Sequence, residues 1–77
     1  MTNNELKNKI SEILKTTEIE LNNLRKDIAS KQQFTREHNF EIENIALSYK
    51  QDALSEVNYI FYKLSEQIEK IFEEDVN

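Results

Sequence analysis

The sequence predicts an all-α fold, an antiparallel, coiled-coil-like helical hairpin that dimerises into a four-helix bundle. The 77 residues contain no Gly and no Pro, so we do not expect the tight turns of an all-β fold or a glycine-rich phosphate loop. Apolar residues recur at steps of three and four along nearly the whole chain, as they do on one side of a helix. A single domain of this size is marginal, and it has no cysteines for disulfides, so oligomerisation is the remaining support.

The first helix of this single domain, residues 1–77, is predicted over about residues 3–33. Thr2 and Glu5 have the spacing of a capping box, in which the Thr hydroxyl accepts from a first-turn amide and the Glu reaches back. The apolar residues that follow form a heptad seam of about three repeats with Thr17 at its one polar position. This seam consists of Ile10, Leu14, Thr17, Leu21, Leu24 and Ile28.

A turn is predicted at about residues 34–39, where the apolar pattern lapses and only Phe34 is apolar. Thr35 and Asn39 are both good helix N-caps. Asn is also the residue that best replaces Gly in the left-handed conformation that ends a helix. We therefore place the reversal at Arg36 to Asn39. The alternative is one uninterrupted helix, since no residue in this segment forbids it.

The second helix, predicted over about residues 40–74, carries two apolar stripes and therefore needs two neighbours. The stripe assigned to the first helix consists of Leu54, Val57, Phe61, Leu64, Ile68 and Ile71. Antiparallel pairing then places Leu14 opposite Phe61, Leu21 opposite Leu54, Ile28 opposite Leu47, Thr17 opposite Val57 and Ile10 opposite Leu64. Leu24 falls opposite Lys50, whose aliphatic stem can lie along the seam.

The second stripe predicts a surface for self-association or for another protein. Small residues in it let another helix approach closely, and the tyrosines beside it have the apolar body and polar tip that interfaces favour. The predicted surface consists of Ile42, Ala46, Tyr49, Ala53, Tyr59, Ile60 and Tyr62. The alternative is that Tyr59 and Tyr62 lie on the surface of a monomer, where single exposed aromatics are common.

Charge separates the two halves of the chain. Residues 1–36 hold five acids and seven bases, whereas residues 37–77 hold ten acids and three bases. This imbalance favours contact between the halves, and the acidic second helix would repel phosphates. We therefore do not expect a nucleic-acid partner. If one binds, the basic residues that gather near the turn are the candidate phosphate contacts, namely Arg25, Lys26, Lys31 and Arg36.

The sequence gives no pattern of catalytic or metal-binding residues, so we expect no enzymatic activity, no metal and no cofactor. The single histidine, His38, lies at the predicted turn beside Glu37 and Glu41. A di-iron site needs such groups to converge from several helices on a bundle interior, and nucleophilic catalysis needs a placed base and an oxyanion hole. A solvated polar loop is the simpler interpretation.

These observations predict a small non-catalytic protein-binding regulator or inhibitor, a homodimer that also binds another protein. Its size and its richness in Asn, Ile and Lys fit a phage- or plasmid-borne protein. The alternatives are a nucleic-acid-binding regulator of the small four-helix-bundle type and an acidic decoy that mimics nucleic acid. No apolar run reaches the length of a membrane span, and the N-terminus lacks signal-peptide features. We therefore expect a soluble cytoplasmic protein with no membrane partner.

Overall fold

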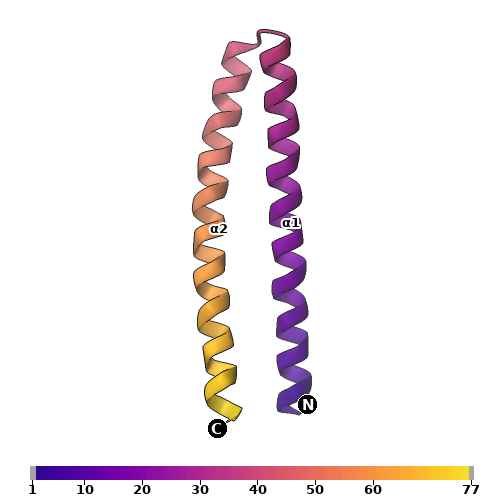
Figure 1. The fold of residues 1–77 in the computed structure, drawn as a ribbon, viewed down its shortest axis with the longest axis vertical. Coiled ribbons are helices and arrows are strands. Elements are labelled where there is room, and N and C mark those ends of the chain that lie inside the picture. Colours follow the sequence, from indigo (N-terminus) through magenta and orange to yellow (C-terminus); the bar gives the residue numbers. More distant parts are fainter. Residues whose placement is uncertain (1, 77) are drawn as a thin grey trace.

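The chain folds into two long helices that lie side by side and antiparallel, α1 (Asn3–Glu37) and α2 (Glu41–Val76), as Figure 1 shows. The structure, a computed structural model, describes the backbone of residues 2–76 and the side chains of residues 2–74. The helices form a rod of 57 × 17 × 13 Å. The predicted all-α hairpin is confirmed, and the alternative of one continuous helix is wrong. Within the described residues, neither helix has an apolar stretch long enough to cross a membrane.

Helix α1 begins at the predicted cap and ends later than predicted. Thr2 Oγ1 accepts a hydrogen bond of 3.1 Å from the backbone N–H of Glu5, which satisfies an amide that the first turn leaves unpaired. The helix then continues to Glu37, past the predicted end near residue 33. It passes through Thr35 because the hydroxyl of this residue finds a partner within the helix, the carbonyl oxygen of Gln32 at 2.8 Å.

The chain reverses between the helices through a Schellman motif, the commonest way to end a helix on a left-handed residue. The backbone N–H of Phe40 donates to the carbonyl oxygen of Thr35 at 2.8 Å, and that of Asn39 donates to Arg36 at 3.3 Å. Asn39 has a φ of 59°, the left-handed conformation that the sequence predicted for it. The rings of Phe34 and Phe40, with centroids 6.2 Å apart, provide the apolar contact that accompanies this motif.

The seam between the helices alternates apolar and polar residues. Helix α1 turns inward Ile10, Leu14, Thr17, Leu21 and Ile28. Helix α2 turns inward Leu47, Leu54, Phe61 and Ile68, interleaved with Asn44, Gln51, Asn58 and Ser65. Among the described side chains, only Leu47 and Thr35 are buried, at 9% and 7% exposure. The hairpin by itself therefore has a very small core.

Two predicted contacts across the seam are wrong. We expected Val57 and Leu64 to face α1, but each is 50% exposed. Their neighbours Asn58 and Ser65 are half-buried in their place. Leu24 is likewise 52% exposed, outside the seam position that its spacing predicted. The cause is rotation of the contact line, because moving one position along a helix turns the side chain by about 100°.

Four side-chain hydrogen bonds of 3.3–3.4 Å set the register of the two helices. Each joins a residue of α1 to a residue of α2. From the open end to the turn, the bonded pairs are Glu18 with Tyr62, the carbonyl of Arg25 with Gln51, Gln32 with Ser48, and Thr35 with Asn44. These bonds therefore show which residue of α2 lies at the same height along the rod as each bonded residue of α1.

Candidate protein-binding surface

The hairpin exposes far more surface than a compact protein of its mass. A folded monomer of 9.2 kDa exposes roughly 4,900 Å² by the usual scaling of area with mass. This hairpin exposes 6506 Å², which exceeds the scaled value by about 1,600 Å². A standard interface buries about 800 Å² on each partner. The surplus is therefore large enough for at least one protein–protein interface.

Much of this exposed surface is apolar and forms one row along each helix. The row on α2 follows steps of three, four and seven and consists of Ala46, Ala53, Val57, Ile60, Leu64 and Ile71, all exposed. The row on α1 is sparser, with steps of seven, eleven and ten, and consists of Leu6, Ile13, Leu24 and Phe34, all exposed, with the exposed charges Glu20, Asp27 and Lys31 between them. Residues at these spacings lie on one side of a helix. We call the two rows together the apolar face.

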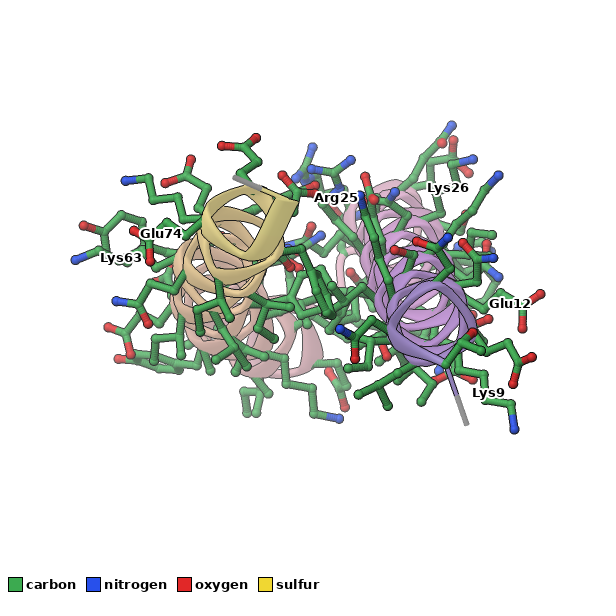
Figure 2. All side chains as sticks on the ribbon, turned by 90° about the horizontal axis from the view of Figure 1, so that it is seen from below. Lys9, Glu12, Arg25, Lys26, Lys63 and Glu74 are labelled. Atoms are coloured by element: carbon green, nitrogen blue, oxygen red, sulfur yellow. The ribbon has the colours of Figure 1, made fainter. Side chains whose placement is uncertain are left out.

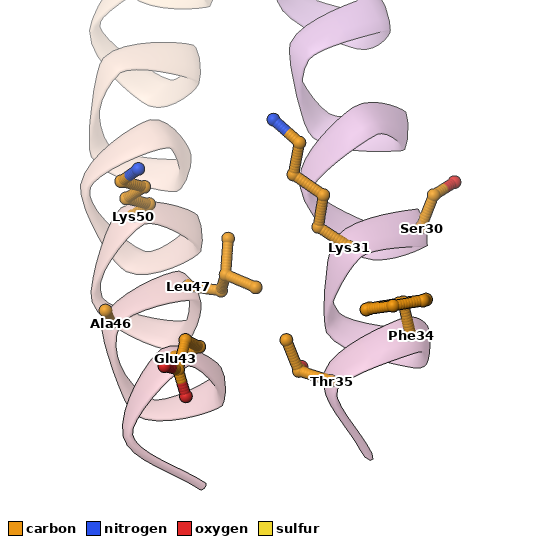
Figure 3. A pocket seen from close by; sticks show the side chains of 8 residues that line it. All are labelled: Ser30, Lys31, Phe34, Thr35, Glu43, Ala46, Leu47 and Lys50. Atoms are coloured by element: carbon orange, nitrogen blue, oxygen red, sulfur yellow. The ribbon is translucent and has the colours of Figure 1, made fainter. Parts of the chain in front are cut away.

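Both rows lie on the same side of the hairpin. A groove between the helices is lined by Lys31 and Phe34 from α1 and by Ala46 and Lys50 from α2, and Figure 3 shows these side chains around it with Leu47 between the helices. Phe34 and Ala46 each belong to one of the apolar rows. Because this groove brings the two rows together near the turn, the antiparallel helices carry them along one common face.

The opposite side of the hairpin is polar. The side-chain bonds that link the helices involve Glu18, Gln32 and Tyr62, which lie outside the apolar rows. In Figure 2, which views the rod along its axis, Arg25 and Lys26 lie on the upper side. The hairpin is thus amphipathic as a whole. One side carries hydrogen bonds between the helices, and the other side exposes the apolar face.

The predicted binding residues do not form one surface. Ala46, Ala53 and Ile60 belong to the apolar face, and Ile60 is 65% exposed. Tyr62 lies on the polar side, where its Oη donates to Glu18 Oε1 at 3.4 Å. The Tyr59 ring carries Lys63 Nζ 5.0 Å from its centroid, a cation–π contact. The remaining predicted residues, Ile42 and Tyr49, are exposed and continue the row of Ile60 toward the turn, at steps of four and three from Ala46.

Several residues of the apolar face were missed by the sequence analysis or given to the wrong contact. Val57, Leu64 and Ile71 were assigned to the seam, and Leu6, Ile13 and Phe34 were given no role in binding. On α2 their signal was present as a second row of three-, four- and seven-residue steps beside the seam row. Two adjacent rows cannot be assigned from hydropathy alone, because both have the same period.

The four candidate phosphate contacts are not brought together. Lys31 lines the groove on the apolar face, and its Nζ lies 3.0 Å from Asp27 Oδ2. Arg36 lines a different depression, beside Asn39 and Asn44. Arg25 and Lys26 lie on the upper side in Figure 2. A row of phosphates would therefore meet these cations on different sides of the rod.

The turn residues considered for metal binding have other partners. The His38 ring stacks on Phe34 with centroids 4.1 Å apart, and its Nδ1 lies 2.9 Å from the Phe34 carbonyl oxygen. Glu37 Oε1 accepts from Gln33 Nε2 at 3.2 Å. In the part of the chain that the structure describes, no three His, Asp or Glu side chains cluster as metal ligands. These contacts hold the turn together.

Comparison of the chain with protein-family models, with curated proteins and with solved structures finds no significant match. The interpretation of the apolar face therefore depends on the geometry and chemistry of the hairpin itself.

Proposed function

We propose that this chain is a small non-catalytic protein-binding regulator or inhibitor that acts through helical self-association and partner binding. The observation that supports the proposal is the apolar face, an uncovered surface that runs along both helices. Large exposed apolar patches mark interaction sites on proteins. Burying them is favourable by about 25 cal/mol per Å² of apolar surface.

Self-association covers this face with the same face of a second copy. Two hairpins stacked in this way form a four-helix bundle, in which the apolar rows become core positions. Two-fold symmetry makes such contacts self-complementary, so one surface is sufficient for both chains. The small side chains of Ala46 and Ala53 allow the helices to approach closely.

A different protein would bind the tyrosine that self-association leaves uncovered. Tyr59 is 63% exposed and lies outside the apolar face, on a helix with nine acids and three bases. Tyrosine is a frequent anchor of protein interfaces, and complementary charge steers association. The preferred partner therefore has a basic surface with apolar pockets.

Two charge-matched double variants separate these activities. Ala53→Glu with Ile60→Glu places two carboxylates on the apolar face, where pairing would bury them, so this variant should be monomeric in sedimentation equilibrium. Ser55→Glu with Tyr59→Glu adds the same charge on another side of α2 and should remain dimeric. In affinity capture from cells that encode the protein, the tyrosine variant should lose partners that the unmodified chain retains. Equal masses for the two variants would contradict the role of the apolar face.

A further inference from the structure

We infer that the second copy docks on the apolar face with its turn at the same end of the bundle, so that α1 of each chain packs on α2 of the other. The inference rests on the self-association proposed above. Two-fold symmetry permits two ways to stack these faces. An axis along the rod keeps the turns together and pairs unlike helices, whereas an axis across the rod separates the turns and pairs like helices.

Helix charges favour the arrangement that pairs unlike helices. Helix α1 holds six acids and seven bases, and α2 holds nine acids and three bases. With the turns together, each acidic α2 has a nearly neutral α1 on both sides and lies diagonally across from the other α2. With the turns apart, the two acidic helices would be direct neighbours over their whole length, which like-charge repulsion disfavours.

The apolar residues also match level by level when the turns lie together. An axis along the rod preserves levels, so each residue of α1 meets the partner's α2 at the height of its own α2 neighbour. The bond between Glu18 and Tyr62 fixes this height at the open end. Further toward the open end, Ile13 then lies opposite the partner's Leu64 about one turn from Glu18, and Leu6 lies opposite the partner's Ile71 about three turns from it.

Charged residues beside the apolar face also match by height when the turns lie together. Lys31, Glu43 and Lys50 line the groove near the turn, and Asp27 bonds to Lys31. The bonds of Arg25 with Gln51 and of Gln32 with Ser48 place Asp27 at the height of residue 50. With the turns together, Asp27 meets the partner's Lys50, so opposite charges face each other at this height.

The opposite arrangement disrupts both matches. It places the charged groove of one chain on the apolar open end of the other, where Lys31 would oppose residues such as Leu6 and Ile13. The midpoint of α1 (Asn3–Glu37) is Glu20, so the two Glu20 side chains would meet at the symmetry axis. Desolvated charges without partners and like charges in contact are both unfavourable.

Spin labels on single-cysteine variants test the orientation, because the chain has no cysteine of its own. Glu37→Cys places a label at the turn, and Asn4→Cys places one at the open end. With the turns together, two labels at position 37 should lie within roughly 25 Å, given helix spacings of 8–10 Å. In mixed dimers, one label at position 37 and one at position 4 should lie much further apart, near the 57 Å length of the rod.

Each outcome has a distinct meaning. Distances near 57 Å between labels at position 37, with short distances in the mixed dimers, would overturn the orientation and leave self-association intact. Labelled chains with a mass of 9.2 kDa would instead overturn self-association itself, and the apolar face would then be the docking site of a different protein. A short distance at position 37 in a species of twice that mass supports the inference.

Discussion

The carbonyl oxygen of Thr35 accepts a hydrogen bond of 2.8 Å from the backbone N–H of Phe40, and this bond closes the turn between the helices. It spans one residue in the left-handed conformation, Asn39. In a chain with no glycine, asparagine is the residue that adopts this conformation at the lowest cost. The direction in which α2 leaves α1, and with it the common apolar face, depends on this one residue.

Substitutions at Asn39 should therefore change stability according to their tolerance of positive φ. Asn39→Val should lower the free energy of unfolding by about 1–2 kcal/mol, because a β-branched residue is strained in the left-handed region. Asn39→Gly is the matched control and should leave stability nearly unchanged, since glycine adopts this φ freely. Urea denaturation followed by circular dichroism measures both. Equal losses for the two variants would contradict the role assigned to the turn.

Truncation of leucines should distinguish the seam from the apolar face. Leu47→Ala removes a buried side chain and should cost about 2–5 kcal/mol of unfolding free energy. Leu64→Ala removes a half-exposed one, so in an isolated hairpin its cost should be small. In a bundle, Leu64 is covered, and its truncation should weaken the dimer and make the melting temperature more dependent on protein concentration. If Leu64→Ala lowers the free energy of unfolding only slightly at every protein concentration, the apolar face is not covered.

The fold was predictable because its signals are local. The Thr2 cap and the left-handed Asn39 each depend on a few neighbouring residues, and the structure shows both. The end of α1 was less predictable. Thr35 resembles an N-cap in sequence, but its hydroxyl bonds to the Gln32 carbonyl inside the helix. The position of this hydroxyl also depends on α2, because Asn44 lies within hydrogen-bond distance of it.

The apolar face was predictable only in part, because it depends on how the two helices are rotated. Ala53 and Ile60 were correctly placed outside the seam. Val57 and Leu64 were not, because hydropathy favours them over Asn58 and Ser65 as seam residues. The structure turns these polar residues inward together with Gln51, whose amide bonds the Arg25 carbonyl. Such a polar bond between helices leaves no periodic signal in the sequence.

Salt should stabilise the protein. Acidic residues are concentrated in α2, especially near its end, where Glu66, Glu69, Glu73 and Glu74 lie close together in the sequence. Repulsion between exposed charges of one sign weakens a fold, and added salt screens it. The melting temperature measured by circular dichroism should therefore rise as sodium chloride increases from low to moderate concentration. A steady fall would show instead that attraction between α1 and α2 dominates.

The mass of the unmodified chain in solution tests the central claim most directly. Because the hairpin exposes 6506 Å² and carries an apolar face along both helices, we predict a stable dimer. Multi-angle light scattering over a range of protein concentrations should give twice the chain mass of 9.2 kDa. A value of 9.2 kDa at every concentration would contradict self-association.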